Sequence, residues 1–333
     1  MKYTSILVLA LIASTCKKEK TTATGAVVFD TTVHCSESVD SVYAFPPCPD
    51  GVAICFPTEA SCLNDTLWKF PCFNPNNPNE ICYIERKPQS TSRFLKYNIL
   101  TGEKTLLYEN ITYGGQPIWC KNNWAYFAGF GKNVARINMS SGAKEMLTNL
   151  NQDRWVTPNI ITGECMFARY VTNAEMYGIK IDPNGTVIDT VSRIPRGDWR
   201  HNIGTSGIGH TMLLIRNYST GTLDTLYEFP VQQGSIQNIK IHPNNKDVYF
   251  TQFYIDGMYK VNIDSKELTL VKEGNNSLWY DNFSISQDGQ KIVFEKVYCQ
   301  YLVPGAMAPV SMKTEIWLMD IDGCNERKLN LDL

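Results

Sequence analysis

The sequence contains little charge, few histidines and no long hydrophobic run. Only 19% of its 333 residues are charged, and 31 Lys and Arg nearly balance 33 Asp and Glu, so the formal net charge is −2. A nucleic-acid-binding surface needs a basic face or stripe, so nucleic acid is not an expected partner. The four histidines offer little material for acid–base or metal chemistry. The 43% of hydrophobic residues still suffices for a folded core.

The N-terminus carries a pattern typical of a targeting signal. The apolar run Ile6–Ala13 is far shorter than the roughly 18 residues that cross a bilayer, which indicates a signal peptide over residues 1–15. Small residues then precede Cys16, which resembles the signal of a bacterial lipoprotein, in which this cysteine is acylated. An ordinary secretory signal cleaved nearby is the alternative. The resemblance implies a lipid-anchored protein of the bacterial cell envelope, on the periplasmic or surface face of the outer membrane, with a flexible tether over 16–26.

Eleven cysteines are too many for a typical cytosolic protein. If Cys16 carries lipid, ten remain, which is an even number in an oxidising compartment. Six of them crowd one proline-rich stretch: Cys35, Cys48, Cys55, Cys62, Cys72 and Cys82. No pair there has the spacing of a zinc knuckle, so disulfides are favoured over a metal, and 15 connectivities stay open.

Residues 27–65 are therefore predicted to form a disulfide-braced segment that packs on the rest of the protein. Part of it, either Val27–Asp30 or Ser41–Phe45, is a candidate strand that closes the fold onto its last repeat. Residues 66–333 form the main domain, in which short alternating strands are separated by Gly, Asn and Asp turns. No second domain is expected.

Internal repeats dominate this main domain. Ile239–Phe250 (IKIHPNNKDVYF) and Phe283–Phe294 (FSISQDGQKIVF) both show a strand, a polar turn and a strand that ends in an aromatic residue. Each copy is followed by a second hairpin, as in Glu315–Leu329 (EIWLMDIDGCNERKL). A spacing near 40 residues with four strands per unit indicates a β-propeller. The repeats predict six blades at about 66–108, 114–148, 155–192, 198–228, 235–272 and 278–330.

The last two quoted segments resemble the repeat of TolB-type six-bladed propellers, in which an Asp-Gly turn precedes an Ile-Trp-x-Met-Asp strand. The resemblance implies an all-β, six-bladed propeller with four antiparallel strands per blade. It implies little about function, because propellers host many unrelated activities. The additional α/β domain of TolB has no counterpart in this sequence, so its partners are not carried over.

The candidate site lies where each innermost strand begins, at the mouth of the channel. The loops that lead into these strands carry aromatic and polar residues suited to a small-molecule, peptide or glycan site. The candidate ligand-binding residues are Trp155, Trp199, Arg200, His201, Gln237, Trp279, Tyr280 and Asp281. The three tryptophans are predicted at equivalent positions, where they either contact ligand or wedge between blades. Asn202, Asn238 and Asn282 are expected to be structural.

A long loop over Val297–Thr314 is expected to overhang the same mouth, either as part of the site or as a clamp held by Cys299. No nucleophile motif or metal-binding pattern is present, so neither a catalytic residue nor a cofactor is assigned. The first hypothesis is a monomeric, non-catalytic binding or scaffold module for a protein, peptide or glycan. The alternative is a polysaccharide-acting lyase or hydrolase that uses His201, Arg200 and Asp281.

Overall fold

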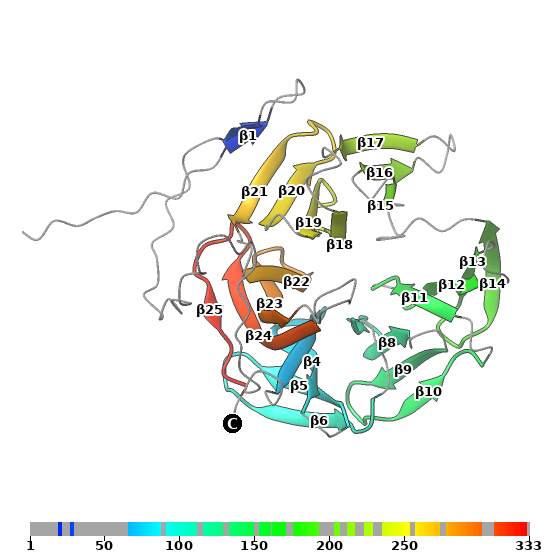
Figure 1. Cartoon of the computed structure of the whole chain (residues 1–333). Coiled ribbons are helices and arrows are strands. Elements are labelled where there is room, and N and C mark those ends of the chain that lie inside the picture. Colours follow the sequence, from blue (N-terminus) through cyan, green and yellow to red (C-terminus); the bar gives the residue numbers. More distant parts are fainter. Residues whose placement is uncertain are drawn as a thin grey trace, which may run out of the picture.

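The computed structural model describes residues 19–21, 27–29, 66–87, 91–111, 116–128, 133–149, 153–160, 162–170, 176–192, 203–206, 212–216, 223–228, 235–253, 257–273, 278–301 and 310–331. These residues form antiparallel sheets arranged in a ring, as Figure 1 shows. The first strand of each sheet lies nearest the centre of the ring and the last strand lies at its rim. The chain is therefore an all-β propeller.

Five sheets contain the full four-stranded blade, and each is named here by its innermost strand. The β3 blade comprises β3 (Leu67–Asn74), β4 (Asn77–Arg86), β5 (Arg93–Asn98) and β6 (Lys104–Tyr108). The β7 blade comprises β7 (Ile118–Trp119), β8 (Trp124–Ala128), β9 (Val134–Asn138) and β10 (Lys144–Met146). The β11 blade comprises β11 (Asp153–Pro158), β12 (Cys165–Tyr170), β13 (Met176–Ile181) and β14 (Val187–Ser192).

The β18 blade comprises β18 (Ser235–Ile241), β19 (Asp247–Phe253), β20 (Gly257–Asn262) and β21 (Leu268–Glu273). The β22 blade comprises β22 (Leu278–Ile285), β23 (Lys291–Tyr301), β24 (Val310–Asp320) and β25 (Arg327–Lys328). The remaining sheet has three described strands, β15 (Ile203–Ser206), β16 (Met212–Arg216) and β17 (Leu223–Glu228). The expectation of six four-stranded blades therefore holds for five of them within the described residues.

The N-terminal strands join the ring at an unexpected place. A strand does form at β2 (Val27–Phe29), but it pairs with β1 (Glu19–Thr21), and β1 pairs with the rim strand β21 through Lys20 and Thr269. The β18 sheet thus gains two strands, whereas the sequence predicted closure onto the last blade. As the last strand of its blade, β21 has an edge that the blade itself does not pair, and such an edge is a natural template for a further strand. β1 also falls within the segment predicted to be a tether.

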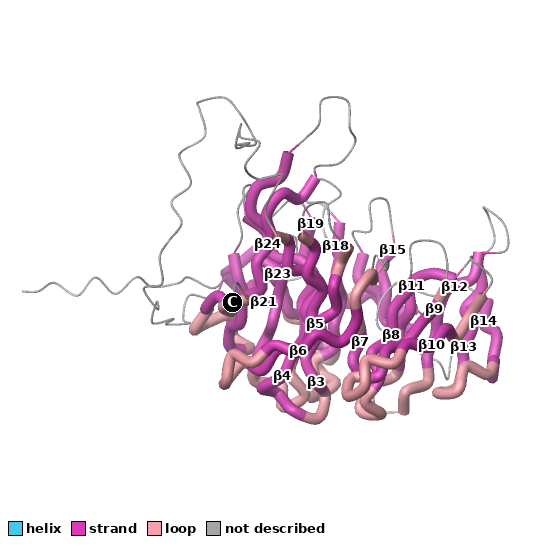
Figure 2. The backbone as a smooth tube through the Cα atoms, turned by 90° about the horizontal axis from the view of Figure 1, so that it is seen from below, coloured by secondary structure: helices cyan, strands magenta, loops and turns pink. Residues whose placement is uncertain are grey.

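Asparagine side chains close the outer hairpins of several blades. The Oδ1 atom of Asn98 accepts hydrogen bonds from the backbone N–H of Leu100 and Thr101, at 2.9 and 3.1 Å. Asn138 and Asn262 make the same pair of bonds in their own blades. Such side-chain bonds mimic a backbone turn, which explains why Asn recurs where the chain reverses. Figure 2 shows the turns gathered along one edge of the ring.

The hydrophobic core lies between blades. Each of five buried clusters combines side chains from two neighbouring sheets; for example, Tyr83 and Leu95 of the β3 blade pack with Val293 and Ile316 of the β22 blade. No helix that could span a membrane occurs in the described part of the chain.

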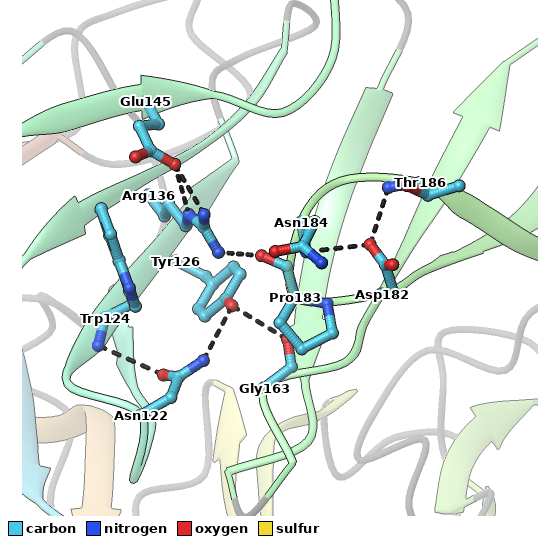
Figure 3. A network of polar contacts seen from close by, with 10 residues as sticks. All are labelled: Asn122, Trp124, Tyr126, Arg136, Glu145, Gly163, Asp182, Pro183, Asn184 and Thr186. Atoms are coloured by element: carbon cyan, nitrogen blue, oxygen red, sulfur yellow. Dashed lines mark hydrogen bonds and ion pairs between the residues drawn. The ribbon is translucent and has the colours of Figure 1, made fainter.

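Polar networks also join the blades, as Figure 3 shows for the β7 and β11 blades. The Arg136 guanidinium lies 4.2 Å above the ring of Trp124, pairs with Glu145 and donates to the backbone oxygen of Pro183 in the next blade. The hydroxyl of Tyr126 donates to the backbone oxygen of Gly163 at 2.9 Å.

Two further expectations change. The strands β23 and β24 extend to Tyr301 and from Val310, so most of the predicted long loop is a projecting hairpin (Figure 2). At the opposite end of the β18 blade, the half-buried His242 contacts the backbone oxygen of Gly289 in the next blade through Nε2 at 3.0 Å.

The cysteine prediction is also wrong in part. Cys72, Cys82, Cys120 and Cys165 are buried and take part in no disulfide in the structure, whereas Cys324 is disulfide-bonded. Three of the four lie in strands and Cys120 directly follows β7, so they contribute to the core as small hydrophobic residues. Cys16 lies outside the described residues, and so do the cysteines of the segment 27–65.

Candidate binding site at the channel mouth

The innermost strands of four blades share a β-bulge near the end at which the chain enters them. The strand pairing shifts between Lys69 and Cys72 in β3, and it shifts at the same place in β11, β18 and β22. A bulge sets two residues of one strand opposite a single residue of its partner. That single residue is aromatic and fully buried in every case: Tyr83, Phe167, Phe250 and Phe294. The aromatic residue that ends each repeat therefore marks the bend of the innermost strand.

The residues that immediately precede the bulges occupy equivalent positions on the innermost strands, which lie nearest the centre of the ring of blades (Figure 1). We call these residues the channel ring: Lys69, Arg154, Gln237 and Asp281. Gln237 is exposed, and Lys69 and Asp281 are half-buried. The ring thus combines basic, amide and carboxylate groups, which can both donate and accept hydrogen bonds.

A buried carboxylate lies directly behind the ring. Glu295 of β23 pairs with Asp281 of β22 across the ladder, and its side chain is 0% exposed. Its Oε2 accepts hydrogen bonds from Asn282 Nδ2 at 3.0 Å and from the backbone N–H of Phe70 at 3.3 Å. The other oxygen, Oε1, has no hydrogen-bond donor and lies 3.5 Å from the Lys69 ammonium.

Burial sets the charge of this group. Desolvation raises the pKa of Glu295 to about 7, an effect that the nearby Lys69 ammonium opposes and the Asp281 carboxylate reinforces. The carboxyl therefore changes its protonation state near neutral pH. Lys69 belongs to the channel ring and its ammonium group also lies beside this carboxyl. The net charge near the ring therefore varies with pH.

Asparagines inside the bulges connect neighbouring blades. Asn238 Nδ2 donates to Asp281 Oδ1 of the next blade at 2.5 Å and to Thr251 Oγ1 of its own blade at 3.1 Å. Asn238 and Asn282 have φ angles of 49° and 35°, in the left-handed region that Asn tolerates better than most residues. Both asparagines link strands, in line with the structural role predicted for them, but their side chains bond other side chains rather than backbone groups. Asn202 lies outside the described residues.

Gln116 links three blades at the same level. It comes just before β7, and its Nε2 donates to the backbone oxygens of Pro71 at 2.7 Å and Phe283 at 3.1 Å. Both acceptors are the second residues of bulges, in β3 and β22. The side chain of Gln116 therefore holds together the bulged strands that carry Lys69 and Asp281.

The structure places only part of the predicted site at the mouth. Gln237 and Asp281 belong to the channel ring, whereas Tyr280 is buried, with its hydroxyl donating to the backbone oxygen of Glu273 at 3.1 Å. Trp155 follows the ring position of β11, but Trp279 precedes the ring position of β22 by two residues, so the two tryptophans are not equivalent. The bulge lies at the same place in both strands, so it does not cause this difference: Trp155 lies 12 residues before Phe167, whereas Trp279 lies 15 residues before Phe294. Trp199, Arg200 and His201 lie outside the described residues.

Sequence reasoning missed Lys69 and Glu295. One signal was present in the repeats: the residue after the buried aromatic is Ile84, Ala168 or Thr251 in other blades, but Glu295 in the last. A carboxylate at a position otherwise taken by small or apolar residues is a candidate functional group.

The fold matches known propellers at low sequence identity. A structure of a putative TolB from Agrobacterium tumefaciens is 14% identical with a TM-score of 0.53, covering 70% of this chain and 86% of that one. Pyrococcus horikoshii acylaminoacyl peptidase is 13% identical with a TM-score of 0.53, covering 81% of this chain and 53% of the peptidase.

This chain thus corresponds to about half of the peptidase, and identities this low show the fold alone. An oligogalacturonate lyase from Vibrio parahaemolyticus matches with a TM-score of only 0.46, which supports no further argument. No family model matches the sequence, and no curated protein matches it closely. The TolB-like propeller architecture is established, and its activity has to be argued from the site.

Proposed function

We propose that this protein is a non-catalytic binding module that holds a peptide segment of a partner protein at the channel ring. The observation that carries the proposal is the mixed ring itself, in which Lys69, Gln237 and Asp281 occupy equivalent positions on neighbouring bulged strands. A peptide backbone presents alternating donors and acceptors, so a ring that offers both types complements it.

The described residues favour a peptide over a glycan. Sugar rings are usually bound against exposed aromatic faces, and Tyr280 is withdrawn into the core with a T-shaped contact to Phe294. Asp281 adds a preference for ligands that carry a basic group, because a half-buried carboxylate attracts a cation more strongly than one in bulk water.

The polysaccharide-acting alternative gains no support from the described residues. Asp281 Oδ1 already accepts hydrogen bonds from Asn238 Nδ2 and from the backbone N–H of Asn282 at 2.9 Å. These bonds fix the position of the carboxylate and occupy one of its oxygens, which suits binding better than proton transfer.

Array binding with the purified full chain tests the proposal. Peptide arrays that vary in charge and a glycan array are probed with the wild-type protein and with Gln237→Ala. We expect wild-type binding to basic peptides and a loss of several-fold in Gln237→Ala, whose exposed position predicts little effect on folding. Binding to glycans alone, or to neither array, would contradict the proposal.

The proposed setting is the bacterial envelope, with the chain anchored through a lipid on Cys16. Incorporation of labelled palmitate into the wild-type protein tests this, with Cys16→Ala as the variant that should lose the label. Equal labelling of both proteins, or of neither, would count against the lipid anchor.

A further inference from the structure

Two buried thiols lie directly opposite each other beside the channel ring. Cys72 of β3 and Cys82 of β4 are partners in the antiparallel ladder, and both are free. Opposite residues of an antiparallel pair have Cα atoms about 4.5 to 5.5 Å apart. A disulfide requires a Cα separation of about 4.4 to 6.8 Å, so the backbone already has the geometry of a bridge.

We propose that Cys72 and Cys82 form an oxidisable dithiol, which accepts a disulfide bond by exchange with an external disulfide and staples β3 to β4 beside the bulge. The structure describes the reduced form of this pair. The bulge lies in β3, just before Cys72, and consists of Phe70 and Pro71. The backbone N–H of Phe70 donates to Glu295, and the backbone oxygen of Pro71 accepts from Gln116. Oxidation would therefore brace the strand that carries Lys69.

The surroundings make Cys72 the attacking thiol. Its Sγ accepts a hydrogen bond from the backbone N–H of Trp119 at 3.4 Å, and Ser284 Oγ lies 4.0 Å away. The Cys82 thiol donates to it and Lys240 adds a favourable charge, so the pKa of Cys72 falls to about 7. Burial raises the pKa of Cys82, which keeps its proton until the second step. A thiolate with a pKa near ambient pH is well suited to disulfide exchange.

The exchange balances with a disulfide oxidant such as oxidised glutathione or a disulfide-form oxidoreductase. The Cys72 thiolate attacks one sulfur of the oxidant, its S–S bond breaks, and the first leaving thiolate takes a proton from solvent. Cys82 then loses its proton and attacks the Cys72 sulfur of the mixed disulfide, which releases the second thiol. Two protein thiols are oxidised and one external disulfide is reduced to two thiols.

Alkylation mapping of the folded chain tests the proposal directly. Trypsin releases both cysteines in one peptide, residues 70–86, because no Lys or Arg lies between Lys69 and Arg86. After incubation of the folded chain with oxidised glutathione, and then with N-ethylmaleimide in denaturant to expose the buried thiols, we expect this peptide without label and lacking two hydrogen atoms. Prior reduction with dithiothreitol should restore two labels. A peptide that takes two labels after oxidation in both the folded and the refolded protein would overturn the proposal.

Stability supplies a second readout. Bridging a loop of this length should raise the Tm by about 5 °C, so dithiothreitol should lower the Tm of the oxidised wild-type protein by that amount. Cys82→Ser should lower this response to the part that the disulfide of Cys324 contributes, whereas Cys120→Ser should retain it in full, because the ladder partners of β7 bring no cysteine opposite Cys120. Equal responses of the wild type and Cys82→Ser would overturn the proposal and would leave the binding role of the ring unaffected.

Discussion

Asp281 and Glu295 lie directly opposite each other on β22 and β23, yet the two carboxylates differ in their environments. Asp281 is half-buried and is held by Asn238 of the preceding blade, whereas Glu295 is fully buried and is held by Asn282 of its own blade. The pair therefore provides one carboxylate at the mouth of the channel and one behind it. Their contacts connect the β18, β22 and β3 blades. The residues of the proposed binding site therefore also hold the last blade against the first.

Replacing Glu295 with Gln should stabilise the protein at alkaline pH. The folded-state pKa of about 7 exceeds the ordinary value of 4.5, so between these pH values the folded state binds more protons than the unfolded state. The free energy of unfolding of the wild type therefore falls as pH rises through this window. Urea unfolding should show Glu295→Gln more stable by up to about 3 kcal/mol at pH 8 and nearly equal to the wild type at pH 4.

The exposed Glu103 supplies the control for this experiment, because Glu103→Gln should change stability little at either pH. A Glu295→Gln variant that is less stable than the wild type at pH 8 would show that the carboxyl is stabilised in its charged form, contrary to this account.

Two glycines with similar backbones should respond differently to alanine. Gly102 and Gly323 have φ angles of +74° and +87°, so either substitution strains the backbone by about 1 kcal/mol. A Cβ on Gly102 would meet nothing within 4 Å, but a Cβ on Gly323 would lie 2.1 Å from the backbone oxygen of Val271 in the preceding blade. Thermal unfolding should show a larger loss in Gly323→Ala, by about 2 kcal/mol or more. Equal losses would mean that the two blades do not approach this closely.

The network between the β7 and β11 blades should depend on Arg136 more than on its acidic partner. The Arg136 side chain is only 10% exposed and contacts Trp124, Glu145 and Pro183, whereas the Glu145 side chain is 47% exposed. Arg136→Ala should cost about 2 to 3 kcal/mol in urea unfolding, because it removes a stacking contact and leaves a buried oxygen without its donor. Glu145→Gln should cost less than about 1 kcal/mol. A reversed order would locate the stabilisation in the ion pair instead.

The architecture was readable from the sequence because propeller repeats carry local signals. Three features recur in each repeat: strands of alternating polarity, turns with Asn or Gly, and an aromatic residue at the end of the second strand. Together they predict the strands and turns of a blade. The three-stranded sheet over 203–228 was predicted as a full blade, since spacing alone cannot show whether a short segment supplies a fourth strand.

The site was less predictable because it depends on register and on contacts between distant segments. Trp155 and Trp279 stand at different positions relative to the bulge, and only the strand pairing shows where that bulge lies. Glu295 contacts Phe70, a residue 225 positions away, so only the closed ring brings them together. Local patterns predict the elements, and long-range pairing creates the site.

The most direct test of the binding role is calorimetry. It compares a carboxylate of the channel ring with one near the opposite ends of the strands. The ligand is the basic peptide with the strongest array signal, and the proteins are the wild type, Asp281→Asn and Asp264→Asn. Asp264 is exposed in the turn after β20, far from the end of the sheet that carries Gln237. The account predicts a Kd about ten-fold weaker in Asp281→Asn, which keeps the shape and the acceptor for Asn238, and an unchanged Kd in Asp264→Asn. Unchanged affinity in Asp281→Asn, or equal losses in both variants, would contradict it.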